Sequence, residues 1–116
     1  MTTLERTLAD VLDRPELSGG LEEVWRSCAS IHGLDLGELE SYVRVVGSRV
    51  LAAKVGLFLD RHRNVLAVSE AQLDRLRALG PEVPVYMERG RPGKVVREWN
   101  LVAPVELVSG AWDSAA

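Results

Sequence analysis

The chain has 116 residues, 47% of them hydrophobic and 27% charged, which is the composition of one globular domain over residues 1–116. The single cysteine, Cys28, excludes an internal disulfide bond. The most apolar run, residues 50–59, contains Lys54 and is too short to cross a bilayer, and no signal-peptide pattern follows Met1. We therefore expect a cytoplasmic protein without membrane contact.

Charge divides unevenly along the chain. Residues 1–43 hold three basic and nine acidic residues, whereas residues 44–116 hold eleven basic and eight acidic ones. An acidic first part joined to a basic second part suggests either a face for an acidic partner or two solvated surfaces of modest bias.

Helical periodicity dominates the first two thirds. A first helix begins at Thr3 and stops before Pro15, and a second runs from about Leu21 to Gly33. Asp35, Ser48 and Ser69 are suited to cap three further helices, over residues 36–46, 48–61 and 69–79.

After Pro81 the hydrophobic period changes to two. The pattern predicts strands over residues 83–87 and 95–102, joined by a hairpin loop over residues 88–94, and a short edge strand over residues 105–108. The expected fold class is therefore α+β, with about five helices packed against a small C-terminal antiparallel sheet or hairpin. Trp25 and Trp99 are the expected aromatic residues of its core.

Three parts of the chain resemble, in the same order, the C-terminal domain of AbiEi-type antitoxins. The opening contains LERTLAD at residues 4–10, followed by residues 14–16 and 19–23. GSRVLAAKVGLFLD at residues 47–60 resembles the central helix of that family, and EWNLV at residues 98–102 resembles its closing strand.

The resemblance implies a role in a bacterial toxin–antitoxin system that causes abortive infection in phage defence. The implied partner is a nucleotidyltransferase-like toxin, neutralised directly or indirectly. In that family an N-terminal winged helix-turn-helix usually represses the operon, and no counterpart precedes Glu5. The resemblance thus implies DNA binding only where such a domain is supplied upstream.

Residue chemistry gives no indication of an enzyme or of a cofactor. Cys28 occupies an apolar helix position, which is typical of an inert buried thiol. His32 and His62 are far apart in sequence and lack neighbouring ligand types, so we expect no metal site. The chain contains no nucleophile elbow, Walker loop or dinucleotide fingerprint.

Basic residues are the candidate contacts to a partner or to nucleic acid. The candidates are Lys54, Arg61, Arg89, Arg91, Lys94 and Arg97. Lys54 and Arg61 are seven residues apart and share a helix face, and the other four cluster in the expected hairpin. An ordinary solvated surface is the alternative interpretation.

Two DNA-binding alternatives remain open. Residues 89–92, Arg-Gly-Arg-Pro, match the core of an AT-hook, although Glu88 precedes them and strands are expected on both sides. Three helices followed by a basic hairpin also spell the order of a winged helix, with Gln72, Arg75 and Arg77 as readers of the bases.

Overall fold

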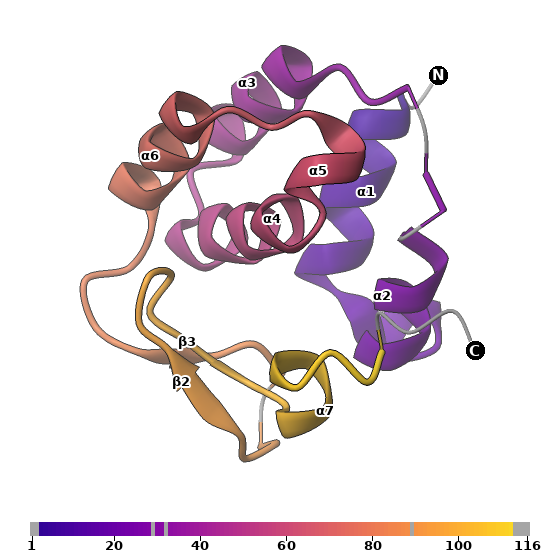
Figure 1. Cartoon of the computed structure of the whole chain (residues 1–116), viewed down its shortest axis with the longest axis vertical. Helices are drawn as coiled ribbons and strands as arrows, with labels where there is room; N and C mark the ends of the chain where they lie inside the picture. The colour runs from indigo at the N-terminus through magenta and orange to yellow at the C-terminus, as the bar shows by residue number, and fades with distance from the viewer. Residues whose placement is uncertain (1–2, 29, 32, 89, 113–116) are drawn as a thin grey trace.

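A helical layer and a small sheet with one short helix make up the fold (Figure 1). The computed structural model describes residues 3–28, 30–31, 33–88 and 90–112. The helices are α1 (Leu4–Asp13), the 3₁₀ turn η1 (Pro15–Ser18), α2 (Leu21–Cys28), α3 (Leu36–Val46), α4 (Arg49–Arg61), α5 (Arg63–Leu66), α6 (Glu70–Leu79) and α7 (Val105–Val108). The strands are β1 (Val85–Tyr86), β2 (Lys94–Val96) and β3 (Leu101–Ala103). The expected α+β class is confirmed.

Helix starts follow the capping residues of the sequence. The side chains of Thr3, Asp35, Ser48 and Ser69 each accept a hydrogen bond from a backbone N–H in the first turn of the helix that follows. These bonds satisfy amides that have no partner inside the helix, which is why small oxygen-bearing residues begin helices. Ser69 is also half of a capping box, because the Gln72 side chain accepts from the Ser69 backbone N–H.

Helix α4 lies at the centre of the helical layer. Figure 1 shows it surrounded by α1, α3, α5 and α6, with the sheet on its remaining side. Every residue from 51 to 59 is buried, so this helix is enclosed all round rather than amphipathic. The core is one continuous cluster that α4 shares with α1, α2, α6 and the sheet.

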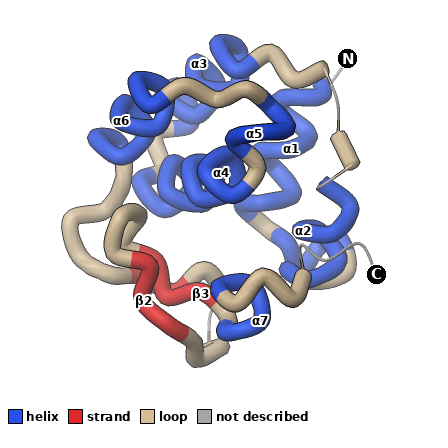
Figure 2. The backbone as a smooth tube through the Cα atoms, in the orientation of Figure 1, coloured by secondary structure: helices blue, strands red, loops and turns tan. Residues whose placement is uncertain are grey.

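The sheet has the strand order β1-β3-β2. The two outer strands differ in direction: β2 pairs antiparallel with β3, whereas β1 pairs parallel with it. Figure 2 shows β2 and β3 as a small region below the helices. The expected antiparallel pairing of residues 83–87 with residues 95–102 is therefore wrong, because β1 pairs parallel with β3 and the antiparallel pair, β2 with β3, lies within the stretch expected as one strand.

The location of the hairpin was predicted wrongly. Residues 95–102 do not form one strand, because a tight turn over residues 97–100 divides them into β2 and β3. Asn100 takes the left-handed conformation there, with φ of 51°, and its Nδ2 donates to the Pro81 carbonyl at 2.8 Å. Since the hairpin turn lies here, the stretch that follows β1 is a crossover to the far side of β3.

Two local features explain this arrangement. Gly93 precedes β2, and a Cβ at that position would collide with the carbonyl of Ala103, so only glycine permits the close pairing. Residues 105–108, expected as an edge strand, instead form the helix α7. Pro104 precedes that helix, and its carbonyl accepts from the backbone N–H groups of Leu107 and Val108.

Trp99 joins the sheet to the helical layer. It lies in the turn between β2 and β3, is 2% exposed, and packs on α4 at Gly56. Its Nε1 donates to Asp60 at 3.2 Å, also on α4. The expectation that Trp99 is a core residue is therefore confirmed, and Trp25 is likewise fully buried, with Phe58 edge-on against its ring.

Candidate protein-interaction surface

Lys54 is not a surface residue. Its side chain is 5% exposed, and Nζ donates to the carbonyl of Asp13, the last residue of α1, at 3.3 Å. Burial lowers the pKa of Lys54 below its usual value, against the opposing effect of Asp13 and Glu16. The expected placement of Lys54 on the surface is wrong, because α4 is enclosed and Lys54 binds a carbonyl inside the fold.

Arg61 also serves the fold. Its Nη2 donates to the carbonyls of Leu107 and Val108, at 3.3 and 2.6 Å, at the end of α7. Arg49 does the same for α6, since its Nη1 donates to the Gly80 carbonyl at 3.2 Å. Three cations of α4 thus bind the C-terminal carbonyls of three other helices, where the helix dipole favours positive charge. The spacing of Arg49, Lys54 and Arg61 along α4 therefore follows from the packing of α4 against these three helices.

Arg91 is held by its neighbours, and Arg89 lies outside the described residues. The guanidinium of Arg91 pairs with Glu88 at 3.1 Å and with Glu106 at 3.5 Å, and it lies 5.3 Å from the ring centroid of Trp112. These contacts connect the crossover after β1 to the C-terminal part of the chain. An arginine in two ion pairs is a poor ligand for a phosphate group.

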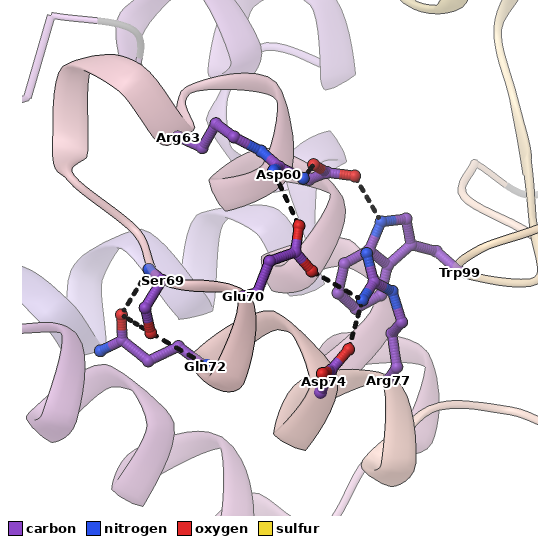
Figure 3. A network of polar contacts seen from close by, with 8 residues as sticks. All are labelled: Asp60, Arg63, Ser69, Glu70, Gln72, Asp74, Arg77 and Trp99. Carbon is purple, nitrogen blue, oxygen red and sulfur yellow. Dashed lines mark hydrogen bonds and ion pairs between the residues drawn. The ribbon is translucent and has the colours of Figure 1, made fainter.

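The arginines of α6 are paired in the same way, as Figure 3 shows for Arg77. Arg77 pairs with Asp74 at 2.6 Å and with Glu70 at 3.6 Å, and Arg75 binds the carboxylate of Glu40 on α3 at 3.0 Å. The base readers of the winged-helix interpretation are therefore largely neutralised. Duplex binding requires cations free to neutralise phosphates.

Asp60 links Trp99 to Arg63 in the chain of polar contacts that Figure 3 shows. It accepts from Arg63 at 2.6 Å and from Trp99 Nε1 at 3.2 Å. Burial alone would raise the pKa of Asp60, but these two hydrogen bonds and the charge of Arg63 hold it below its ordinary value. Asp60 is therefore a structural carboxylate that fixes the indole of Trp99.

Lys94 and Arg97 are the two remaining candidates, and the structure places Lys94 at the start of β2 and Arg97 directly after its end. Both are exposed, and no ion pair or hydrogen bond engages either side chain among the residues that the structure describes. We call this pair the edge cations. They are the part of the expected basic cluster that stays available to a partner.

An apolar row accompanies the edge cations. The register places Tyr86, Val102 and Val95 opposite one another across the three strands, on the face away from the helices. Tyr86 is 56% exposed and Val95 49%, whereas Leu101 in the neighbouring row is fully buried. We call Tyr86, Val102 and Val95 the outer row. Aromatic and aliphatic side chains flanked by charge are typical of protein interfaces.

A groove opens between β2 and the helices α4 and α7, with a volume of about 550 Å³. Its apolar lining residues are Leu57, Val95, Val96 and Val108, and Arg97 and Glu98 line it as well. The groove therefore lies beside the edge cations.

Sequence reasoning missed the outer row. The alternation in residues 83–87 places the side chain of Tyr86 on the opposite face of the strand from its neighbours. Which of the two faces meets solvent depends on the parallel pairing of β1 with β3. No short-range signal encodes that pairing, because the crossover resembles a hairpin loop.

The remaining titratable candidates have ordinary structural surroundings. Cys28 is buried, and burial raises the pKa of its thiol to about 11, which matches the expected inert thiol. His62 stacks against Phe58, with ring centroids 4.4 Å apart, and its Nδ1 lies 2.8 Å from the Phe58 carbonyl. His32 lies outside the described residues.

Comparison with protein-family models, with curated proteins and with solved structures found no match to this chain. Within the part of the chain that the structure describes, no helix has the length and apolar character to span a membrane.

Proposed function

We propose that this chain is the partner-binding module of a bacterial antitoxin, acting in the cytoplasm on a nucleotidyltransferase-like toxin. The observation that carries the proposal is the surface at the sheet, where Tyr86 and Val95 of the outer row are exposed beside two cations that have no ion pair among the described residues. The resemblance to the AbiEi C-terminal domain supplies the class of partner. Tyr86 is the expected energetic centre, because tyrosine is enriched among residues that dominate interface affinity.

The distribution of cations favours a protein partner over DNA. A nucleic-acid surface needs many free basic residues, whereas Lys54, Arg61, Arg75, Arg77 and Arg91 are engaged within the fold. Two free cations beside an apolar row fit a small acidic and apolar surface better than a phosphate backbone. The winged-helix alternative would require the ion pairs of α6 to open.

The experiment pairs the chain with the nucleotidyltransferase-like protein encoded beside its gene. Growth rescue in cells that produce the toxin, and calorimetric titration of the purified proteins, are measured for wild type, Tyr86→Ala, and the double variant Lys94→Glu/Arg97→Glu. We expect each variant to weaken binding at least about tenfold and to reduce rescue, with unchanged circular dichroism.

A double reversal of Arg6 on α1 and Arg14 directly after it, Arg6→Glu/Arg14→Glu, is the matched control. It changes the net charge equally, and both residues are exposed and belong neither to β2 nor to the groove beside it. Wild-type affinity in the β2 variants, or equal losses in the control, would refute the proposed surface. The absence of a toxin gene beside this one would refute the antitoxin assignment.

A further inference from the structure

We propose that the free edge of β2 binds an extended acidic segment of the partner protein as a fourth strand of the sheet. This inference rests on the proposed function and specifies how the partner is held. It uses three observations: the backbone groups along β2, the groove beside them and the edge cations.

The backbone of Val95 faces away from the sheet. The carbonyl of Val102 accepts from Met87 N–H at 3.1 Å, so the polar groups of Val102 face β1. Because successive residues of a strand face opposite sides, Leu101 and Ala103 bond with their partners Val96 and Lys94 on β2. The N–H and C=O of Val95 therefore point to the open edge, and no backbone hydrogen bond from elsewhere in the described chain reaches them.

An added strand would lie beside the groove. Alternate side chains of that strand would project towards α4 and α7, where Leu57 and Val108 offer apolar contact. The other side chains would extend the outer row beyond Val95. The edge thus supplies main-chain hydrogen bonds, and the groove supplies pockets for side chains, which are the two parts of β-strand addition.

The charge at this edge selects an acidic segment. Lys94 begins β2 and Arg97 follows its end, so the cations stand at both ends of the free edge. Asp60 and Arg61, which also line the groove, are already engaged by Trp99 and by the carbonyls of α7. Glu98 lines the groove as well and is exposed, so Lys94, Arg97 and Glu98 together leave a net positive charge of 2 - 1 = 1 at this edge. Two copies of this edge would bring like charges together, which opposes self-pairing as lysine does on many edge strands.

The test uses labelled eight-residue peptides with alternating valine and glutamate, or alternating valine and lysine. Binding to the full chain is measured by fluorescence anisotropy, and hydrogen exchange of the Val95 amide by NMR. We expect the glutamate peptide to bind at least about tenfold more tightly than the lysine peptide. We also expect it to slow exchange at Val95 at least tenfold, because that amide gains an acceptor.

Two substitutions at Val95 distinguish the contribution of its backbone N–H from that of its side chain. Val95→Pro removes the outward N–H and should abolish peptide binding, since proline is tolerated on an edge where that group has no partner. Val95→Thr keeps the N–H and a branched side chain and should bind within about threefold of wild type. If Val95→Pro fails to fold, protection of the Val95 amide in the wild-type chain decides the question.

Preference for the lysine peptide, binding without protection of Val95, or dimerisation through β2 in sedimentation would overturn the strand-addition proposal. The toxin titration separates this failure from that of the proposed function. If Lys94→Glu/Arg97→Glu weakens toxin binding while Val95→Pro does not, the surface stands and strand addition falls. If neither substitution affects the toxin, the proposed surface fails as well.

Discussion

The indole ring of Trp99 packs directly against Gly56 of α4. The six-membered ring of the indole lies where the Cβ of any other residue at position 56 would be, so the sheet approaches α4 only because that helix has a glycine there. Glycine in the middle of a helix is costly, by about 1 kcal/mol relative to alanine. The contact with Trp99 offsets that cost and explains the small residue in a helix that is otherwise well packed.

Gly56→Ala should therefore destabilise the protein, although alanine is the better helix former. We expect a loss of about 1–3 kcal/mol from the displaced indole, measured by urea denaturation. In a Trp99→Ala background the same substitution should become neutral or stabilising, because the obstacle is gone. A stabilising effect of Gly56→Ala in the wild-type background would contradict the described packing.

Trp99→Ala should lower the free energy of unfolding by about 3–5 kcal/mol, because the indole is almost fully buried. Trp99→Phe keeps a ring on Gly56 but loses the hydrogen bond to Asp60, and should cost less. Denaturation followed by circular dichroism gives both values. A denaturation midpoint unchanged in Trp99→Ala would mean that the indole is exposed in solution.

Because of Asp60, the free energy of unfolding should decrease at acidic pH. The folded state holds its pKa below the ordinary value of 3.8, so its stabilisation is present above that value and is lost as pH falls through the folded-state pKa. Asp60→Asn should cost roughly 1–2 kcal/mol at pH 7, and the difference from wild type should shrink towards pH 3. Asp74→Asn, at an exposed ion pair, is the control with a smaller effect.

Lys54→Met should leave partner binding unchanged and should maintain or raise stability. Burial opposes the charged form of Lys54, so a neutral side chain of similar length removes that cost while it fills the same space. Lys54→Ala should instead cost about 2–4 kcal/mol, because it leaves a cavity beside α1. Loss of toxin binding by a stable Lys54→Met protein would return this residue to the interaction surface.

This chain alone should show no specific DNA binding. Its net charge is -3, and the arginines on α6 are engaged by carboxylates. At near-physiological salt we expect affinities no tighter than about 10⁻⁶ M for the promoter fragment, an A·T-rich duplex and a G·C-rich control. Nanomolar binding to the promoter fragment would favour the winged-helix interpretation. Nanomolar binding to the A·T-rich duplex would favour the AT-hook interpretation.

The starts of α1, α3, α4 and α6 could be predicted because their signals are local, whereas the short helices α5 and α7 were not expected. Ser48 and Ser69 cap the helices expected after them, and Gly47 ends α3 in a left-handed conformation. Such signals depend on neighbours within one turn, which the sequence displays directly. The α+β order followed from the change of period near Pro81.

The sheet and the roles of the cations could not be predicted, because both depend on distant partners. The crossover before β2 contains glycines and a proline, as a hairpin loop does, yet the real turn lies at Trp99 and Asn100. Lys54 and Arg61 appeared to share an exposed face, and only the positions of α1 and α7 show that both point to helix ends. Hydrophobic periodicity indicates which residues of a helix or strand share a face, but it does not indicate which other part of the chain packs on that face.

The three helix ends bound by α4 have a consequence for how the molecule comes apart. Arg49, Lys54 and Arg61 connect one central helix to α6, α1 and α7, which are far apart along the chain. Loosening the end of α1 leaves the buried Lys54 without its acceptor, and loosening the end of α6 or α7 removes the acceptor of an exposed arginine. These contacts therefore connect the ends of α1, α6 and α7 to the central helix α4. Native-state hydrogen exchange should show these ends opening together with α4 as a single cooperative unit.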